Sequence, residues 1–404
     1  MAKRDRMTAA EAAEALGVAV PTIYAYVSRG LLRSEEGVGD RRKWYRRADV
    51  QALLDRKELR GNPTKAVEGA LNWGEPILDS AISLITDGEL YDRGEPATRL
   101  AAESTVEQVA EWIWTGQDST GAPFGIERLS RFEKHPIVRE ARSLPPIERF
   151  QVVLAVASTR DPSAFDTRPA SVTALGARLV RLMAAVASGD FESERPIAEV
   201  LQRAWLPKRR EAERLLSAAL ILAADHELNS SAFTVRCAAS TGANPYAAVI
   251  AGLSALQGPK HGGHCDRVEA LFDEAGEADR AQAALMARVR RGESVPGFGQ
   301  PLYPDGDPRG RLLLQLANDA RPKSDETRLA QELAEAGREV LNAEPTIDFG
   351  LVSLCRSLGL PDGSAITLFA LGRAIGWIGH VIEQYESDRL IRPRARYTGA
   401  LPTA

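Results

Sequence analysis

The sequence predicts a mainly helical protein, because apolar residues recur at three- and four-residue spacing along most of it. The segments with this spacing lie near residues 104–116, 146–158, 173–187, 209–226, 244–256, 279–291, 325–341 and 364–384. Residues 80–94 form the only convincing strand pair, since two short apolar runs flank the turn residues Asp87 and Gly88. We therefore expect a body that is nearly all helix, with one hairpin at its start.

The composition is that of an ordinary soluble globular protein of two or three domains, with 404 residues, 44% hydrophobic and 26% charged. The longest apolar runs, 217–224 and 365–371, are much shorter than the roughly 18 residues that span a bilayer. The amino terminus also lacks the pattern of a signal peptide. The chain has three cysteines, Cys237, Cys265 and Cys355. They are too few and too scattered for a disulfide framework or a four-thiolate zinc site. We expect a cytoplasmic protein with no membrane partner.

The net charge of −4 conceals an asymmetry between the start of the chain and the rest. Residues 1–60 carry 13 Lys or Arg against 9 Asp or Glu, a net of +4. The other 344 residues carry 38 against 46, a net of −8. This division favours a polyanion contact confined to the first 60 residues.

Residues 1–60 predict a small helical module. Thr8 and Glu11 fit a capping box ahead of a short helix over residues 9–16. Pro21 suits the first turn of a second helix. The buried face of that second helix is predicted from three residues at helical spacing, which are Ile23, Tyr26 and Val27.

The opposite face of the second helix suits a DNA major groove, where short polar side chains and Arg can contact base edges. The candidate base-contacting residues are Thr22, Tyr24 and Arg29. A turn over residues 37–40 then leads into a basic stretch that we predict to be a phosphate-contacting wing. Its cations are Arg41, Arg42, Lys43, Arg46 and Arg47.

The order of these pieces, which continues through Gly30-Leu31-Leu32 and Ala48-Asp49-Val50, resembles the winged helix-turn-helix of the MerR and excisionase type. The resemblance implies a DNA-binding domain over 1–60, a linker over 61–69 and double-stranded DNA as a partner. A dimer is also implied, because a single copy would bind too weakly to specify a site. The alternative is a small helical module that docks on another protein, with its Arg run as a solvated face.

Histidines concentrate in the second half of the chain, where His226 precedes the motif Gly258 to Gly263 that contains His261. The possible metal ligands in this region are His261, His264, Cys265 and Asp266. Structural zinc needs about four supported ligands, and a helix would point Cys265 and Asp266 in different directions, so no metal is predicted. The glycines indicate instead a backbone that approaches a ligand at a helix start, with His261 exposed to it.

Further candidates lie in loops, at helix starts and near the carboxyl end. Asp348 begins a helix among apolar neighbours, where desolvation would raise its pKa and suit it to proton abstraction. A simple N-capping role for this Asp is the alternative. Fixed arginines suit carboxylate recognition. The remaining candidates are Gln300, Arg309, Arg373 and Arg392.

With these motifs in view, residues 70–404 resemble the citrate synthase family. The hairpin, the stretch Ser104 to Gly116, the His261 motif and the ending Arg392 to Gly399 occur in that family's order and spacing. The resemblance implies a mainly helical homodimer in which each subunit has a large and a small domain. It places the large domain at 70–262 and 361–404, and the small domain at 263–360.

The resemblance also implies a role for each candidate. His261 would stabilise the enol form of acetyl-CoA while Asp348 removes the methyl proton. The carboxylates of oxaloacetate would be held by His226, Arg309 and Arg373, together with Arg392 of the partner subunit. The implied substrates are an acyl-CoA and a 2-oxo acid, with no further cofactor, and monomers would be inactive.

The main departure from the family pattern is Gln300, which stands where the family has a second catalytic His in a GFGH motif. That His polarises the keto oxygen and protonates it, whereas Gln can donate a hydrogen bond but no proton. Losing such a group typically lowers the rate by about 10²–10⁴-fold. Pro301 and Pro304 replace the Arg and Lys that often follow, so the CoA phosphate contacts are also altered.

Two hypotheses follow from the matches and the departure. The first is a citrate synthase-type acyltransferase, with activity weakened or redirected by Gln300 and with an accessory DNA-binding module. The second is a DNA-binding transcription regulator in which the synthase-like body has become a metabolite sensor. The two are compatible, because a closing dimer can couple ligand level to DNA binding.

Overall fold

The computed structural model describes residues 6–28, 32, 34–37, 40–47, 50, 78–117, 124, 129–395 and 397–400. The predicted linker 61–69 and the candidate Arg29 lie outside this description. The chain divides into two compact units, Met1–Asp79 and Ser80–Ala404, which are described separately.

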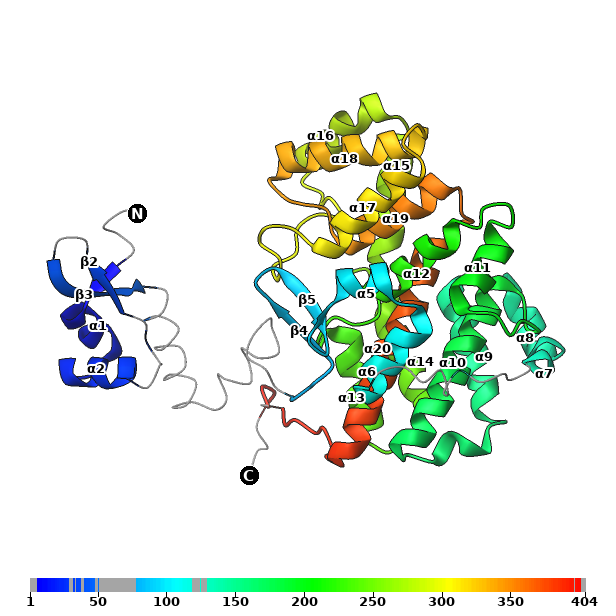
Figure 1. Cartoon of the computed structure of the whole chain (residues 1–404), viewed down its shortest axis with the longest axis horizontal. Helices are drawn as coiled ribbons and strands as arrows, with labels where there is room; N and C mark the ends of the chain where they lie inside the picture. The colour runs from blue at the N-terminus through cyan, green and yellow to red at the C-terminus, as the bar shows by residue number, and fades with distance from the viewer. Residues whose placement is uncertain are drawn as a thin grey trace. The chain divides into compact units, whose positions relative to one another are not determined.

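The amino-terminal unit contains two helices and a three-stranded antiparallel sheet (Figure 1). Helix α1 (Ala9–Leu16) begins at the predicted capping box, because Thr8 Oγ1 accepts from Glu11 N and Glu11 accepts from Thr8 N. It is followed by α2 (Val20–Ser28). The sheet has the order β1-β3-β2, with β1 (Arg6–Thr8), β2 (Ser34–Gly37) and β3 (Asp40–Arg46).

This sheet corrects the prediction that residues 80–94 hold the only strand pair. The basic stretch 41–46 forms the central strand, and its Tyr45 lies opposite Met7 of β1. Tyr45 and Met7 are both buried against Ile23, which closes a small core with α1 and α2. The strand was not predicted from the sequence because the stretch is rich in Arg and Lys, and charged residues are not typical of a strand.

The body begins with the predicted hairpin, formed by β4 (Ser83–Thr86) and β5 (Glu89–Asp92), and a short strand β6 (Glu95–Pro96) pairs with β5. Ten helices follow within the described residues: α5 (Ala97–Glu103), α6 (Val106–Thr115), α7 (Ser130–Glu133), α8 (Pro136–Glu140), α9 (Pro146–Ser158), α10 (Pro169–Ser188), α11 (Ile197–Trp205), α12 (Ala212–Leu222), α13 (Ser230–Ala239) and α14 (Pro245–Leu256).

The last part of the body is also helical, and its elements are α15 (His264–Ala275), α16 (Ala281–Arg290), α17 (Pro308–Ala320), α18 (Asp325–Leu341), α19 (Ile347–Leu358) and α20 (Ser364–Ser387). Helices α15 to α19 gather as one group in Figure 1. This group coincides with the segment 263–360 that the resemblance assigns to a small domain, and that domain division stays a prediction. The mainly helical fold class is confirmed.

Helix α20 lies at the centre of the body, where it packs against α6, α10, α12, α13 and α14 (Figure 1). Trp377 and Ile378 are fully buried in it. By length and composition alone, α20 and α10 could each cross a membrane. The most apolar 18-residue stretch is 100% buried in α20 and 67% buried in α10, as in the core helices of a globular protein. The length and composition of these two helices are therefore weak support for a membrane span.

Small residues on α20 bring one loop of the body close to it. A Cβ at Gly376 would lie 2.4 Å from both Ala224 O and Asp225 Oδ1. Gly376 N donates to Ala224 O at 3.1 Å. A side chain at this position would therefore push away the loop that carries His226, so the glycine positions that histidine.

Candidate active site

The candidate site lies where a loop and several helix starts meet beside α20. His226 lies in the loop before α13, His261 in the turn before α15, Arg309 in the first turn of α17 and Asp348 in the first turn of α19. Their charges act on one another: the pKa of His226 is lowered well below its usual value by burial and by Arg309, Arg373 and His261. The structure thus brings together five of the predicted residues.

His261 is half-buried and its Nε2 lies 2.7 Å from Ser231 Oγ. Trp377 Nε1 donates to the same oxygen at 3.2 Å, and Asn229 Oδ1 lies 2.8 Å from it. The indole can only donate, so the single hydroxyl hydrogen of Ser231 goes to either His261 or Asn229. When it goes to His261, the imidazole carries its own hydrogen on Nδ1, which has no hydrogen bond among the described residues.

The imidazole of His261 is neutral at physiological pH. Desolvation, with a smaller contribution from the charge of Arg373, lowers the pKa of His261 to about 4. The ring also stands edge-on to Phe369, with 6.3 Å between ring centroids. This arrangement suits a neutral hydrogen-bond donor better than a cation.

The glycines of the His261 motif allow close packing within the protein, and the expected close approach of this backbone to a ligand stays a prediction. A Cβ at Gly263 would lie 2.5 Å from Gln257 O, and one at Gly262 would lie 2.4 Å from the Leu256 side chain. Gly263 N donates to Leu256 O at 2.9 Å. The motif is therefore glycine-rich because the turn folds back onto the end of α14.

Asp348 is not the N-cap of its helix, which decides against the capping alternative. The cap position of α19 is Thr346, and Asp348 instead accepts a hydrogen bond from Cys265 Sγ at 3.3 Å. Desolvation raises the pKa of Asp348, against the opposing effects of His264, of the Cys265 bond and of Arg309. A carboxylate whose pKa lies above its ordinary value is a better proton acceptor.

His226 and Tyr303 form a contact that the sequence did not reveal. His226 Nε2 lies 3.1 Å from Tyr303 Oη, and the two rings are tilted at 54° with their centroids 5.7 Å apart. Desolvation raises the pKa of Tyr303, so its hydroxyl stays protonated. The phenol thus fixes the orientation of His226 from the loop that also carries Gln300.

Arg309 is held by a buried ion pair. Its Nε and one terminal nitrogen donate to the two carboxylate oxygens of Asp307 at 2.9 and 2.8 Å. Asp307 also caps α17 and accepts from Ile347 N of the α19 start at 3.2 Å. One carboxylate therefore orients Arg309 and joins the starts of two helices, and the paired fork presents Arg309 in a single geometry.

Among the described residues, Arg373 forms no ion pair with a carboxylate. Its Nε donates to Ala223 O at 2.7 Å, and its guanidinium carbon lies 5.0 Å from the centroid of the Phe369 ring. Burial lowers the pKa of Arg373 to about 10, with Arg309 acting in the same direction and Asp225 and Asp92 against it. Arg373 is therefore a buried cation that remains available for an anionic ligand.

Gln300 is half-buried in the loop after Phe298, and its side chain folds onto its own loop. Its Oε1 accepts weakly from Leu302 N at 3.4 Å, while its backbone carbonyl accepts from Tyr303 N at 2.9 Å. The amide nitrogen donates to no group among the described residues. Gln300 can thus donate one hydrogen bond from the loop that holds Tyr303 against His226.

Arg392 is the predicted residue that the chain does not bring to this site. It is exposed, follows the end of α20, and makes no hydrogen bond or ion pair with another candidate among the described residues. A location outside its own subunit's site is what the resemblance implies for an Arg that serves the partner. That role stays a prediction.

A second group of buried polar residues lies behind the arginines. Asp225 accepts from Ser83 Oγ at 2.5 Å and lies 3.2 Å from His380 Nε2. Asp92 stands opposite Ser83 in the hairpin, is fully buried and makes no side-chain hydrogen bond. Desolvation and the charge of Asp225 raise the pKa of Asp92 well above its ordinary value. The sequence did not reveal this group, since its members are far apart along the chain.

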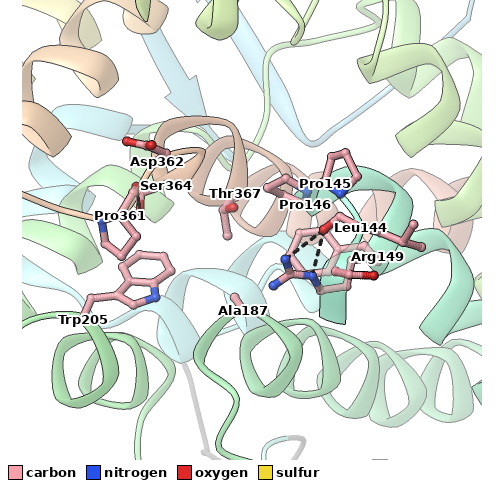
Figure 2. Close-up of a pocket in the computed structure, with 12 residues that line it drawn as sticks. Leu144, Pro145, Pro146, Arg149, Ala187, Trp205, Pro361, Asp362, Ser364 and Thr367 are labelled. Atoms are coloured by element: carbon pink, nitrogen blue, oxygen red, sulfur yellow. Dashed lines mark hydrogen bonds between the residues drawn. The ribbon is translucent and has the colours of Figure 1, made fainter. Parts of the chain in front are cut away.

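A cavity of about 440 Å³ elsewhere in the body contains none of the predicted catalytic residues. In Figure 2 it lies between α9, α11 and the start of α20, with Thr367 and Ala187 between Trp205 and Arg149. There the guanidinium of Arg149 donates a hydrogen bond to Leu144 O at 2.8 Å. No group of three or more metal-ligating side chains occurs among the described residues.

The candidate DNA-contacting residues are described only in part. Lys43, Arg46 and Arg47 are exposed, and Thr22 is half-buried. Three further candidates lie in described elements but have side chains outside the description: Tyr24 in α2, and Arg41 and Arg42 in β3. These assignments stay predictions.

Comparison with known proteins finds a matching family model for each of the two units. Residues 70–394 match the family model for the C-terminal domain of citrate synthase, and residues 6–58 match a helix-turn-helix domain model. Citrate synthase 2 of Bacillus subtilis is 37% identical over 185 residues, which span 45% of this chain and 50% of that relative. Citrate synthase of Deinococcus radiodurans is 27% identical over 368 residues, covering 84% of this chain and 96% of that relative.

A solved structure supports the same assignment. The crystal structure of citrate synthase from Thermotoga maritima aligns with a TM-score of 0.69 at 26% identity, covering 82% of this chain and 96% of that chain. The family model alone covers most of the body described above. The chain therefore belongs to the citrate synthase family and carries an amino-terminal helix-turn-helix domain.

Proposed function

We propose that the body is a condensing acyltransferase that joins acetyl-CoA, or a slightly larger acyl-CoA, to oxaloacetate or a related 2-oxo acid. The observation that carries this proposal is that a neutral imidazole, His261, and a desolvated carboxylate, Asp348, both lie close enough to the buried Arg373 to interact with its charge. No cofactor is needed, because the acyl-CoA enters as a substrate.

In the proposed reaction, Asp348 removes a proton from the carbon next to the thioester carbonyl. His261 donates a hydrogen bond from Nδ1 to the thioester oxygen, so that the enol forms without a free carbanion. Ser231 favours this donor tautomer when it gives its hydrogen to His261 Nε2, at 2.7 Å. A neutral donor is sufficient here, since the proton leaves to the carboxylate.

The 2-oxo acid is bound by Arg309, Arg373 and His226. The enol carbon attacks the keto carbon, which forms the new carbon–carbon bond and leaves negative charge on the keto oxygen. Gln300 stabilises that oxygen by an amide hydrogen bond, but the proton that it gains comes from water. Water then cleaves the thioester and releases the CoA thiol.

A thiol-release assay tests this function directly, across several acyl-CoAs and 2-oxo acids. We expect turnover by the native chain that falls about 10³-fold in Asp348→Asn and less in Gln300→Ala. Exposed Asp266 lies one turn from the His261 motif, and Asp266→Asn is the matched carboxylate control. Native turnover no higher than that of Gln300→Ala and Asp348→Asn with every substrate pair would reject the proposal.

The enzyme would act as a homodimer in the cytoplasm, with Arg392 of the partner subunit completing each site. Mixing two inactive variants, His261→Ala and Arg392→Ala, would then produce heterodimers with one intact site each. We expect the mixture to recover up to about a quarter of native activity by random assortment of the two variants. No recovery after verified subunit exchange would contradict the shared site.

A second function is supported by the amino-terminal unit, which we propose binds double-stranded DNA. The exposed cations Lys43, Arg46 and Arg47 on and beside β3, together with the helix-turn-helix match, favour this. Ligand binding in the body would then alter DNA affinity, which makes the chain a metabolite-responsive regulator.

Footprinting on genomic fragments, with and without 2-oxo acids and citrate, tests this second function. Each phosphate contact contributes about 1 to the slope of log affinity against log salt, so Lys43→Ala should lower that slope by about 1. The exposed Lys323, in the body, provides the control in Lys323→Ala. A DNA affinity that does not change with any of these ligands would contradict the sensor role. No binding to any DNA fragment would contradict the proposed DNA-binding function.

A further inference from the structure

Two consecutive side chains at the start of α15 connect the proposed catalytic elements. His264 Nε2 accepts from Gly297 N at 2.9 Å, and Cys265 Sγ donates to Asp348 Oδ1 at 3.3 Å. Both residues follow directly after the turn that carries His261. The start of α15 thus contacts the loop that leads to Gln300 and the helix start that carries Asp348.

We infer that Cys265 and His264 are positioning residues for the proposed condensation, with Cys265 orienting the Asp348 carboxylate and His264 fixing the loop that leads to Gln300. This inference rests on the proposed function. Neither residue needs to touch a substrate, because each acts through the group that it holds.

The thiol is well suited to hold a base without weakening it. Cys265 is fully buried, and burial together with the charge of Asp348 raises the pKa of its thiol well above the ordinary value, so it remains a donor. A thiol is a weaker donor than an amide or a hydroxyl. The bond therefore fixes one oxygen of Asp348 while stabilising the charged form only slightly, which leaves the carboxylate basic.

The second oxygen of Asp348 accepts no hydrogen bond from the described residues and remains available for the substrate proton. The charged and titratable groups that act on the Asp348 carboxyl come from three elements around it: His264 and Cys265 of α15, Asp307 and Arg309 at the start of α17, and Arg373 of α20. Among these, Cys265 is the hydrogen-bond donor to Asp348.

His264 contributes through the backbone. Because its Nε2 accepts from Gly297 N, this nitrogen carries no hydrogen and the imidazole fixes the peptide three residues before Gln300. Gly297 itself has φ +88°, and a Cβ there would lie 3.0 Å from Val268 and 3.1 Å from Phe349. The loop is thus tied to α15 at a position where glycine is required.

The test uses the full-length chain and compares Cys265→Ala, Cys265→Ser and Cys355→Ala. Cys355 is also buried, in α19, but makes no hydrogen bond to Asp348, so its removal controls for a lost core thiol. We expect kcat to fall about tenfold to a hundredfold in Cys265→Ala, since a misplaced base loses about that much. KM should change little.

The pH profile separates positioning from packing. Removing the donor should move the acidic limb of kcat/KM to higher pH in Cys265→Ala, because the charged form of Asp348 loses a stabilising bond. The stronger donor in Cys265→Ser should leave the limb at or below its native position, and Cys355→Ala should not move it. Equal shifts in both Cys265 variants, or none, would overturn the role of Cys265.

His264 is tested by His264→Gln, whose amide oxygen can still accept from Gly297 N, against His264→Leu, which cannot. We expect the Gln variant to retain most of the native kcat and the Leu variant to lose about tenfold. The KM for the acyl-CoA should stay unchanged in both. Equal activity of the two variants would overturn this part of the inference.

A spectroscopic readout keeps this inference separate from the proposed function. The infrared S–H band of Cys265, assigned by its loss in Cys265→Ser, should shift as Asp348 ionises and should not titrate in Asp348→Asn. If the native chain shows no turnover, the proposed function fails, and this titration then decides the coupling alone. An S–H band that does not shift with pH in the native chain would contradict the hydrogen bond between Cys265 and Asp348.

Discussion

The two halves of the candidate site differ in how far they keep the pattern of the family. On the side of the acyl donor, His261 and Asp348 are both present, and each is fixed by a bonded neighbour, Ser231 and Cys265. On the proposed side of the acceptor, Arg309 and Arg373 are buried and oriented, yet Gln300 stands where the family pattern has a histidine.

This difference indicates that enol formation and carbonyl activation can change independently. The donor half is built at two helix starts that α15 ties together. Gln300 instead lies in a loop between α16 and α17, where it is held only by local contacts with Leu302 and Tyr303. A substitution in that loop alters one polar group without disturbing the helices that carry the base.

The largest effect is expected in the donor half. Asp348→Asn should lower kcat about 10³-fold, because it removes the general base while keeping shape and volume. Thiol release measures the rate, and hydrogen exchange of the acyl-CoA in deuterated water measures enol formation separately. Retention of more than a tenth of native kcat would show that the base lies elsewhere.

A smaller effect is expected from the acceptor half. Arg373→Leu should raise the KM for the 2-oxo acid about 10²-fold, since a buried cation that recognises a carboxylate is lost. The KM for the acyl-CoA should not change. Thermal unfolding checks that the variant folds, and Arg328→Leu, at an exposed position, is the control. Equal changes in both KM values would contradict separate halves.

A gain of function would sharpen the comparison further. Gln300→His restores a group that can both donate a hydrogen bond and give a proton, so kcat should rise about tenfold to a hundredfold. A single-turnover measurement shows whether the condensation step itself becomes faster. An unchanged kcat in this variant would mean that the altered loop limits acyl-CoA binding instead.

The smallest expected effect is on stability and concerns one histidine from each half, His226 and His261. His226 and His261 have lowered pKa values when folded, so their neutral forms stabilise the protein above the unfolded pKa. That stability is lost as pH falls from about 6.5 toward about 4, by about 2 kcal/mol for His261 after allowance for solvent screening. Chemical denaturation across this range measures it.

The non-titrating variant His261→Gln should show a weaker decline over the same pH range. The comparison between the variant and the native chain isolates this histidine from the buried acids Asp92 and Asp348. If the free energy of unfolding fell equally with pH in the variant and the native chain, the pKa of His261 would not be lowered by folding. Proton NMR of the imidazole then provides an independent titration, with a midpoint at about 4.

Much of the local structure was predictable from the sequence. The helix over 325–341 was predicted with its observed bounds, and the capping box at Thr8 and Glu11 was confirmed. These features depend on residues three or four positions apart, which a sequence displays directly. The sheet in the amino-terminal unit was missed because its central strand is made of charged residues whose partners are distant.

The sequence by itself determined the mainly helical fold class, the family and the types of reactive group among the candidate residues. The tertiary structure alone decided what each group does: that Asp307 orients Arg309, that Ser231 can set the tautomer of His261, and that Cys265 reaches Asp348. The physical reason is that protonation and direction depend on neighbours in space. Cys265 and Asp348 are 83 residues apart along the chain, and only packing of α15 against α19 brings them into contact.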